Sequence, residues 1–579
     1  VVLPLLKASS RTRRLAAKCP PATPPLELQM AEVSTSGRER WSNTLAFVFA
    51  AIGSAVGLGN FWRFPLIVAR YGGGLFFIPY LLSLFLLGIP LLLLELGIGQ
   101  QFQRNAYDAF AQMNTRFKGV AVSSLLTGSM IVIYYCTVLS YILVFLVYSF
   151  TSVDGKLPWA DNALFLLTDV SKSQLSDFSA AGLATPGPLV SGITGGLFVA
   201  WLFTFLCVMG GPKWVSRVVY VTMPLPVICL IVLLGRSVTL PGASDGLSRY
   251  ATGLLTIENP LGDWHMWADA MGQIFFSLTL GFGVMPAYGS YNDKKNNVVR
   301  NTLIIAISNS LISILAGFCV FAAYGYLANL SGQTVEEVIS LSGLTTAFIV
   351  FPAIIATLPG GLAAQQFFAV VFFIMLFTLG LDSAFSIVEA VSTCLNDNRK
   401  ALIPESLDKY FPRQVTSGLL CLFFFLLGLP YVTTNGLWYL DIMDHCMTWM
   451  LMFNGFCTVV MAGWFWTSTG KTLPFKDQIP DLATLLKKLT VTDDNKLATA
   501  YAYHLKFILP ILMLLGVIST YAFDASAGGY GGYPTETLFL GWAFYIFFVF
   551  VMIVMAFVPY KPNVDPDVSF SGTKVVNAS

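Results

Sequence analysis

Asp382 is a carboxylate residue inside an otherwise apolar stretch of the chain. An ionised side chain in a membrane interior costs several kcal/mol unless a cation or a partner compensates it. Two pairs of neutral polar residues, Gln273/Ser277 and Asn309/Ser313, have i, i+4 spacing, which places each pair on one face of a helix. Their amide and hydroxyl groups can solvate an ion without bringing charge. These residue types are typical of ion binding.

Two glycine-containing segments interrupt apolar stretches: Gly53–Asn60, and Phe276–Gly283 with Pro286 after it. Glycine loosens a helix that lipid would otherwise enforce. Broken membrane helices are tolerated where they line an enclosed cavity, and in transporters their free N–H groups bind anionic groups while their carbonyls bind cations. Either segment alone could simply allow close helix packing. Two of them at corresponding places in the chain predict a central binding site.

The composition indicates that these segments lie in a membrane. Charged residues make up 11% of the 579 residues, apolar residues make up 56%, and the mean hydropathy is +0.71. We count about twelve apolar runs long enough to cross a bilayer as helices, including Leu75–Leu94, Leu125–Val147, Leu303–Gly325 and Leu538–Val558. They lack the alternation of barrel strands, so we predict an all-α membrane protein with twelve transmembrane helices.

Charges in the loops predict the orientation. Basic residues precede the first span and return in alternate loops, and the intervening loops are mostly acidic or neutral. By the positive-inside rule both termini are cytoplasmic, and the expected location is the plasma membrane, with an organelle as the alternative. A net charge of +2 gives no indication of nucleic-acid binding. The expected partners are the bilayer and a small-molecule substrate.

The ends of the chain differ from its centre. Residues 1–37 are predicted to be a disordered cytoplasmic tail, with an organellar transit segment as the alternative, and residues 561–579 a second cytoplasmic tail. Residues 38–560 form the expected membrane domain. The nine cysteines are scattered without a CxxC motif, so neither a disulfide framework nor a zinc site is indicated.

Several motifs resemble the neurotransmitter:sodium symporter family, over about residues 38–560. They appear in the expected order at Asn60–Pro65, Gly72–Gly74, Ile78–Tyr80, Leu240–Ala243, Gln273–Leu278, Ser290–Asn292 and Gly380–Ser383. The resemblance implies the fold of the bacterial leucine transporter, with discontinuous helices 1 and 6 at the start of a 5+5 inverted repeat. Its halves would be residues 41–236 and 267–465, with helices 11 and 12 in about 505–560.

The resemblance also implies sodium-driven symport by alternating access and two sodium sites. The first site would use Ala55, Asn60, Ser277 and Asn309, completed by the carboxylate of the substrate. The second would use the carbonyls of Gly53, Val56 and Leu379 and the side chains of Asp382 and Ser383. Asn309 or Ser383 alone could instead be a packing hydrogen bond. Chloride is expected at Tyr80, Gln273, Ser277 and Ser313, because relatives that do not need chloride resemble this chain but carry an acidic residue at the position of Ser313.

By the same resemblance, the substrate carboxylate would meet the N–H groups of Leu58 and Gly59 and the hydroxyl of Tyr135. The amino group would meet Ala55, Phe276, Ser277 and Thr279. Amine transporters of the family have an aspartate where this chain has Gly57, which favours an amino acid. The side-chain end of the pocket is apolar and predicts a neutral, hydrophobic amino acid, with core packing as the alternative for each of its residues: Ile131, Phe276, Phe282, Ala384 and Ile387.

Two gates are implied. The outer gate would pair Arg63 with Asp444, with Phe276 and Tyr135 as an aromatic lid, and a charged side chain at that depth needs a partner. The inner gate would pair Arg38 with Asp397, although an exposed pair without function is the alternative. Its bracing residues would be Trp41, Tyr291 and Glu389.

Other functions remain open. Glycine or γ-aminobutyrate could be the substrate, and the same fold could serve as a channel or a sensor that does not transport. The retained ion and gate residues favour transport. An enzyme is disfavoured because no nucleophile–base pair stands out and the three histidines, His265, His445 and His504, are dispersed.

Overall fold

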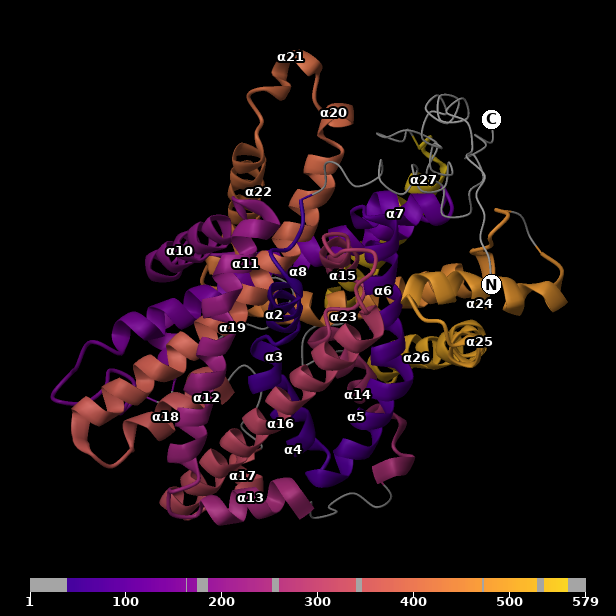
Figure 1. Cartoon of the computed structure of the whole chain (residues 1–579). Coiled ribbons are helices and arrows are strands. Elements are labelled where there is room, and N and C mark those ends of the chain that lie inside the picture. Colours follow the sequence, from indigo (N-terminus) through magenta and orange to yellow (C-terminus); the bar gives the residue numbers. More distant parts are fainter. Residues whose placement is uncertain are drawn as a thin grey trace, which may run out of the picture. The chain divides into compact units, whose positions relative to one another are not determined.

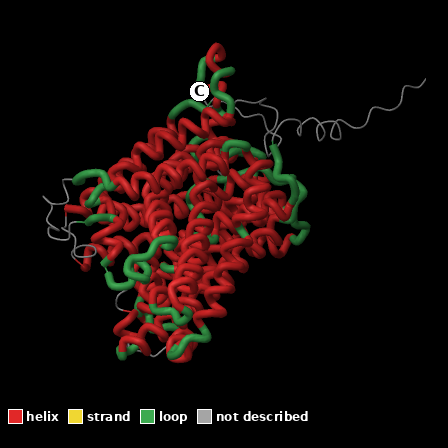
Figure 2. Tube along the Cα trace, turned by 90° about the vertical axis from the view of Figure 1, so that its left-hand side faces the viewer, coloured by secondary structure: helices red, strands yellow, loops and turns green. Residues whose placement is uncertain are grey.

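The computed structural model describes residues 39–162, 164–173, 186–252, 260–339, 346–470, 473–527 and 536–560. Residues 40–579 form one compact unit, and the fold below is that of its described part. That part is built of helices and loops, without a strand (Figure 2). The predicted helical class is confirmed.

Nine continuous helical segments of the described chain are long and apolar enough to span a membrane. They are Gly74–Phe102, Lys118–Tyr148, Ser191–Val208, Gly211–Ser237, Val298–Ser331, Gly361–Asp397, Arg413–Val432, Gly436–Phe465 and Asn495–Ser519. A tenth span consists of Thr44–Ala55 and Leu58–Arg70, which are bent by 62° at a break. The pair α14 (Trp264–Ser277) and α15 (Val284–Gly289), together with α27 (Glu536–Phe557), would bring the number to the predicted twelve.

The labelled elements follow in chain order. Those before residue 260 are α2 (Thr44–Ala55), α3 (Leu58–Phe61), α4 (Arg63–Arg70), η2 (Gly74–Phe76), α5 (Phe77–Ser83), η3 (Leu84–Gly88), α6 (Ile89–Phe102), α7 (Ala106–Met113), α8 (Lys118–Tyr148), η4 (Leu166–Val170), α10 (Ser191–Val208), α11 (Gly211–Thr222), α12 (Pro224–Ser237) and α13 (Ala243–Thr252). Those after it, besides α14, α15 and α27, are η5 (Pro260–Gly262), α16 (Val298–Ser331), α17 (Val335–Ile339), η6 (Thr346–Val350), α18 (Phe351–Ala356), α19 (Gly361–Asp397), α20 (Arg399–Leu402), α21 (Glu405–Asp408), α22 (Arg413–Gly428), η7 (Leu429–Val432), α23 (Gly436–Val460), η8 (Met461–Phe465), α24 (Phe475–Thr490), α25 (Asn495–Tyr503), η9 (His504–Ile508) and α26 (Leu509–Ala527).

The first span breaks where the sequence predicts. Asn43 caps α2 by accepting a hydrogen bond from the Ala46 N–H at 2.9 Å. The helix ends at Val56, which has an extended backbone, and α3 begins at Leu58. The side chain of Asn60 accepts a hydrogen bond from the Gly57 N–H at 2.9 Å and so stabilises the new helix start. In Figure 1, α2, α3 and α4 succeed one another beside α16 and α19.

The sixth span also breaks as predicted. After α14 ends, Thr279, Gly281 and Gly283 all have positive φ, at 54°, 78° and 77°. Glycine adopts this conformation without steric cost, whereas threonine adopts it only when its surroundings hold it. The chain resumes a helix at Val284. Both interruptions therefore expose backbone groups to the interior of the protein.

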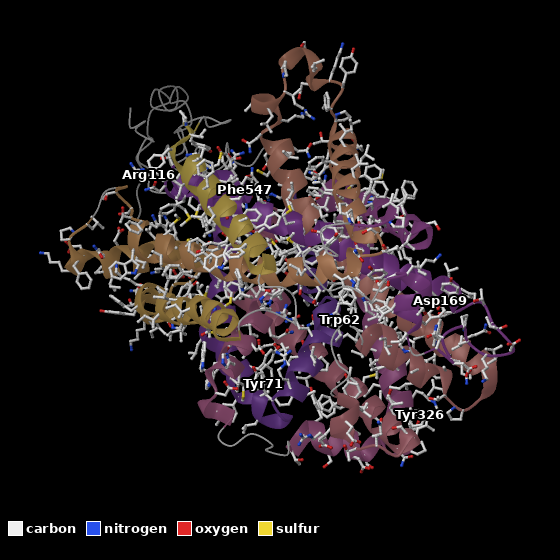
Figure 3. All side chains as sticks on the ribbon, turned by 180° about the vertical axis from the view of Figure 1, so that it is seen from behind. Trp62, Tyr71, Arg116, Asp169, Tyr326 and Phe547 are labelled. Atoms are coloured by element: carbon white, nitrogen blue, oxygen red, sulfur yellow. The ribbon has the colours of Figure 1, made fainter. Side chains whose placement is uncertain are left out.

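Both described ends of the compact unit contact segments that carry basic residues. The Arg40 guanidinium forms a 3.0 Å ion pair with Asp293, in the loop between α15 and α16. At the other end, the Tyr560 hydroxyl donates to Asp108 of α7 at 3.1 Å. Arg116, labelled in Figure 3 close to α27, lies over the Phe557 ring at 5.8 Å. We call this face, with the connection 103–117 that contains α7 and the loop 290–297, the basic side. Two ends on one side require an even number of spans.

Candidate ion and substrate site

Asp382 faces the first helix break. A Cβ atom placed on Gly53 would lie 2.6 Å from Asp382 Oδ2, so only glycine allows the carboxylate this close to the backbone of α2. Asp382 is buried, and its Oδ1 has no hydrogen-bond partner among the described residues. An unpartnered carboxylate oxygen in such a place is costly unless a cation meets it. This cradle fits the predicted second sodium site.

The other residues predicted for that site surround the same break. The Ser383 hydroxyl donates to the Ser54 carbonyl at 3.2 Å, which ties α19 to α2. Val56 and Leu379, predicted through their carbonyls, are both buried. Oxygen donors of this kind suit a hard monovalent cation.

The first predicted sodium site is a buried cluster of amides and a hydroxyl. Asn60 Nδ2 donates to Asn309 Oδ1 at 2.8 Å and to Ser277 Oγ at 3.3 Å. Asn309 Nδ2 in turn donates to Ser277 Oγ at 2.7 Å. Three distant parts of the sequence are thus brought together as predicted. Ala55, the fourth predicted residue, is buried at the end of α2.

Two of the four predicted chloride residues, Ser277 and Ser313, belong to this hydrogen-bonded cluster. Ser313 Oγ accepts a hydrogen bond from Asn60 Nδ2 at 2.8 Å, which links it to Ser277. The Tyr80 hydroxyl donates to Ser310 Oγ at 3.0 Å, one turn before Ser313 on α16. Gln273 is buried and its Oε1 has no partner among the described residues, and no hydrogen bond within the described chain joins its side chain to Tyr80, Ser277 or Ser313. Sequence reasoning missed Ser310.

The predicted carboxylate end of the pocket lies at the start of α3. The Leu58 N–H donates to the Tyr135 hydroxyl at 3.4 Å. A Cβ atom on Gly57 would lie 2.7 Å from Ser383 Oγ and 3.3 Å from that hydroxyl. The glycine therefore keeps a narrow space open between two hydroxyl groups, while a Cβ on Gly59 would make only ordinary contact, at 3.9 Å from Arg63 Cβ.

The two breaks are bonded to each other. Thr279 Oγ1 donates to the Ser54 carbonyl at 3.1 Å, and Ser54 Oγ donates to Ser386 Oγ at 2.8 Å. The bond to the Ser54 carbonyl helps to hold Thr279 in its left-handed conformation. Ser54 and Ser386 were not singled out from the sequence, because a small hydroxyl residue on a membrane helix carries no sign of its partner.

The predicted side-chain end is apolar. Ile131, Phe282, Ala384 and Ile387 are all buried in one cluster, and Phe276 packs against it. The rings of Phe276 and Phe282 are 6.4 Å apart between centroids. Gly128, one turn before Ile131 on α8, was missed from the sequence. A Cβ atom at this position would lie 3.3 Å from both Ile387 Cγ2 and the Phe282 carbonyl oxygen. The absence of a side chain at Gly128 therefore determines how much room the apolar end of the pocket has.

Glu95 of α6 was also missed. It is buried, and its Oε1 accepts a hydrogen bond from the N–H of Gly281 at 2.9 Å. The carboxylate thereby satisfies a backbone group that the second break leaves free. The sequence offered one signal, an acidic residue within a long leucine-rich span.

The predicted outer pair is not formed. The Arg63 guanidinium lies over the Phe276 ring, 4.3 Å from its centroid. Asp444 instead accepts a hydrogen bond from the Tyr134 hydroxyl at 2.9 Å. Among the described residues, no ion pair joins Arg63 to Asp444. Arg63 nonetheless contacts the aromatic ring that was predicted to cover the pocket.

On the basic side, the predicted bracing residues do assemble. Trp41 Nε1 donates to the Tyr288 carbonyl at 3.0 Å, and the Trp41 and Tyr291 rings meet edge to face. The Tyr291 hydroxyl donates to Glu389 at 3.1 Å. Glu389 also pairs with Arg413 at 2.5 Å, a partner that sequence reasoning missed.

The predicted ion pair of the inner gate has only one described member. Asp397 Oδ2 accepts a hydrogen bond from Asn105 Nδ2 at 2.9 Å, and Arg38 lies outside the described residues.

Known proteins are similar to this chain over most of its length. A profile of the Sodium:neurotransmitter symporter family matches residues 38–177 and 169–562. The chain is 32% identical to the sodium- and chloride-dependent GABA transporter 2 of Mus musculus, over 79% of this chain and 78% of that one. It is 34% identical to the sodium- and chloride-dependent taurine transporter of Canis lupus familiaris, over 75% and 73%.

A solved structure is similar as well. The crystal structure of MhsT in complex with L-phenylalanine matches with a TM-score of 0.63 and 25% identity, over 84% of this chain and all of that one. The protein is therefore a multi-pass membrane transporter with two interrupted helices. It belongs to the sodium:neurotransmitter symporter family.

Proposed function

We propose that the protein is a symporter that uses sodium and chloride to move a neutral amino acid across the membrane by alternating access. The Asp382 carboxylate carries the proposal: it is buried against Gly53, and one of its oxygens has no partner in the described part of the chain. A sodium ion there would neutralise the charge and bind α19 to α2. A second ion at Asn60, Asn309 and Ser277 would be completed by the substrate, which couples the two.

The pocket favours an amino acid with an apolar side chain. The space beside Gly57 is bordered by the Ser383 and Tyr135 hydroxyls, of which that of Tyr135 can donate to a carboxylate, and no acidic residue stands there to hold an amine. The opposite end is apolar at Phe282 and Ile387. The similarity to MhsT, whose structure holds L-phenylalanine, supports a hydrophobic substrate.

A second candidate is an ω-amino acid such as γ-aminobutyrate or taurine. The specific observation in its favour is the 32–34% identity to GABA and taurine transporters, above the 25% identity to MhsT. Such substrates also present an acidic group, so the space beside Gly57 fits them equally. They differ from a hydrophobic amino acid in having no side chain to fill the end at Ile387.

For the topology we propose that both termini are cytoplasmic and that the membrane is the plasma membrane. The basic side carries the loops that the positive-inside rule assigns to the cytoplasm. Residues 1–37 and 561–579 would be the two tails, outside the membrane domain of residues 38–560.

Uptake into proteoliposomes tests the function. Labelled phenylalanine, leucine, glycine, γ-aminobutyrate and taurine are each offered with an inward sodium and chloride gradient and with each ion replaced. Saturable, sodium-driven uptake of the hydrophobic amino acids is expected. Uptake of γ-aminobutyrate or taurine alone would favour the second candidate. Binding of a substrate without uptake would indicate a sensor and contradict the proposal.

A further inference from the structure

A cavity on the basic side lies among α24, the end of α6, α7 and the loop between α15 and α16. Its volume is about 700 Å³. Three lysines line it: Lys294 from the loop, and Lys487 and Lys488 from the last turn of α24. Among the described residues of the lining, Asp493 is the only acidic one. The cavity therefore has a net positive charge that suits an anion.

Two of the three lysine charges, those of Lys294 and Lys487, have no carboxylate partner among the described residues. The Lys294 ammonium has no hydrogen bond or ion pair with the described residues. Desolvation by the surrounding protein and, next, repulsion from Arg104 lower the pKa of Lys294. Lys487 donates to the amide oxygen of Asn495 at 3.1 Å, which is a neutral group. An anion bound here would relieve this repulsion.

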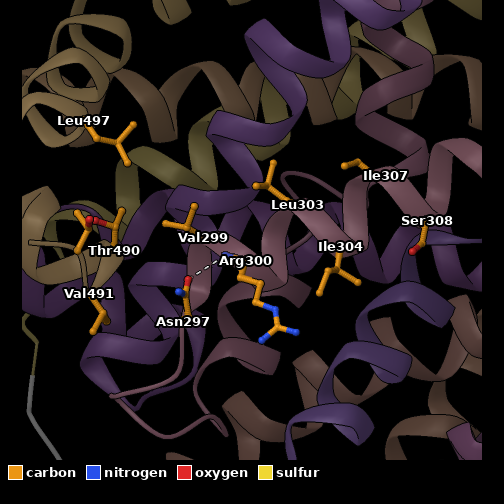
Figure 4. Close-up of a pocket in the computed structure, with 11 residues that line it drawn as sticks. Asn297, Val299, Arg300, Leu303, Ile304, Ile307, Ser308, Thr490, Val491 and Leu497 are labelled. Carbon is orange, nitrogen blue, oxygen red and sulfur yellow. Dashed lines mark hydrogen bonds between the residues drawn. The ribbon is translucent and has the colours of Figure 1, made fainter. Parts of the chain in front are cut away.

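An apolar groove borders the basic cavity. It has a volume of about 560 Å³ and shares Val491 and Thr492 with the cavity. Its wall contains Leu303, Ile304 and Ile307 of α16, and Figure 4 shows these side chains along the same helix as Arg300. Arg300, which has no carboxylate partner in the described chain, adds a further positive charge. Charge and apolar surface thus adjoin.

Beyond the groove, α16 presents an exposed apolar face. Leu303, Ile307 and Leu311 are spaced four residues apart, so they lie on one face of the helix. They are exposed by 38%, 45% and 55% within a segment that is apolar enough to span the membrane. In a bilayer this face is covered by acyl chains. Arg300 lies one turn before Leu303, where a headgroup would meet those chains.

We propose that the basic cavity and the apolar groove together bind one acidic phospholipid from the leaflet on the basic side. Its phosphate lies among Lys294, Lys487 and Lys488, and one acyl chain follows the groove toward Leu311. A soluble phosphate would use the lysines but would gain nothing from the groove, which is why the geometry favours a lipid. The proposal concerns a surface away from both helix breaks and does not depend on which substrate is carried.

The test is lipid binding to the purified full chain in detergent, measured by native mass spectrometry. Phosphatidylglycerol and phosphatidylcholine with the same oleoyl chains are titrated in parallel. We expect the chain to bind the acidic lipid preferentially. Each lysine removed should weaken that binding about fivefold, so K294Q/K487Q/K488Q should weaken it about 100-fold and leave phosphatidylcholine unaffected. The control K213Q removes an exposed lysine of α11 that lines neither cavity, and it should behave as the parent.

Two further experiments distinguish a bound lipid from a soluble phosphate compound. I307N makes the groove polar and should weaken phosphatidylglycerol binding while leaving all three lysines in place. Glycerophosphoglycerol, the headgroup without chains, should not displace the lipid at equal concentration. Equal binding of both lipids, an unchanged triple variant, or displacement by the free headgroup would each overturn the proposal. If the triple variant fails to fold, K487Q alone decides, because Lys487 donates only to the exposed Asn495.

Discussion

Asp382 Oδ2 lies 2.6 Å from the point where a Cβ atom of Gly53 would be. The carboxylate of one helix is thus pressed against the bare backbone of another, at the break in the first span. Any larger residue at position 53 must displace Asp382, even though the two residues are 329 positions apart in the sequence. The glycine and the aspartate therefore act as one unit of the proposed second sodium site.

We expect Asp382→Ala to make uptake insensitive to low sodium concentrations, because it removes the charged ligand of that site. Gly53→Ala should displace the carboxylate and raise the sodium concentration for half-maximal uptake about tenfold, which corresponds to ~1.4 kcal/mol. The measurement is sodium-dependent uptake into proteoliposomes.

Gly272→Ala is the matched control for Gly53→Ala, because a Cβ atom at Gly272 of α14 would meet nothing within 4 Å. It should keep the sodium dependence of the parent. If Asp382→Ala also kept it, Asp382 would be a structural residue.

Much of the fold could be predicted from the sequence. Apolar runs give membrane helices directly, and the glycines of Gly53–Gly59 and Gly281–Gly283 mark both breaks, because no other residue so readily leaves a helix within lipid. The basic loops predict a common side for the ends; Arg40 and Tyr560 contact Asp293 and Asp108, and the orientation of the termini in a membrane stays a prediction.

The site was predictable only in part. Asp382 was evident because a buried carboxylate is rare in membrane spans. Ser310 was missed because the register that turns it toward Tyr80 depends on how α16 packs, not on its residue type. Gly128 was missed for a similar reason: its importance lies in the approach of Ile387 and Phe282 from other helices. The partners of Arg63 and Asp444 were likewise set by tertiary contacts.

We expect Gly57→Asp to abolish uptake of the native substrate. Its carboxylate would enter the space beside the Ser383 and Tyr135 hydroxyls and repel the acidic group of the substrate. Gly57→Asn has nearly the same size without the charge and separates the two effects: binding should be weaker than in the parent but stronger than with aspartate. Equilibrium binding of labelled substrate measures this. Unchanged affinity in Gly57→Asp would contradict the carboxylate assignment.

Gly128→Ala should narrow the apolar end of the pocket. The new methyl group would lie 3.3 Å from Ile387 Cγ2, so long side chains lose space. We expect uptake of phenylalanine to fall about tenfold relative to alanine, within the range that one methylene group gives in a hydrophobic pocket. Gly195→Ala on α10, where a Cβ would meet nothing within 4 Å, is the control. A parallel loss for both substrates would place the effect outside the pocket.

The thermal stability of the protein should depend on acidic pH in part through Asp108 of α7, which lies outside the membrane spans. Burial raises the pKa of Asp108, and the charge of Asp397 adds to this, while hydrogen bonds from Asn105, Asn398 and Tyr560 oppose it. A raised pKa in the folded state means that stability falls as pH rises between the unfolded value of 3.8 and the folded value. On acidification the parent should therefore gain thermal stability relative to Asp108→Asn. The same difference in Tm at every pH would contradict this.

Finally, we expect transport to require chloride. Asn60 Nδ2 donates both to Ser313 Oγ at 2.8 Å and to Asn309 Oδ1 at 2.8 Å, so the proposed chloride and first sodium sites share a side chain. The described groups around them are neutral, and a sodium ion alone would leave an uncompensated charge in a medium of low dielectric constant. An anion beside Ser313 would compensate it. Replacing chloride with gluconate should therefore stop sodium-driven uptake.

Ser313→Glu should restore uptake in gluconate, because a fixed carboxylate then takes the place of the anion. Ser313→Gln has a similar size without the charge and should not restore it, which separates charge from packing. Both variants are compared with the parent in proteoliposomes loaded without halide. If the parent transports equally well in gluconate, Tyr80, Ser277 and Ser313 are packing groups. If Ser313→Gln restores uptake as well as Ser313→Glu, the negative charge is not what the site needs.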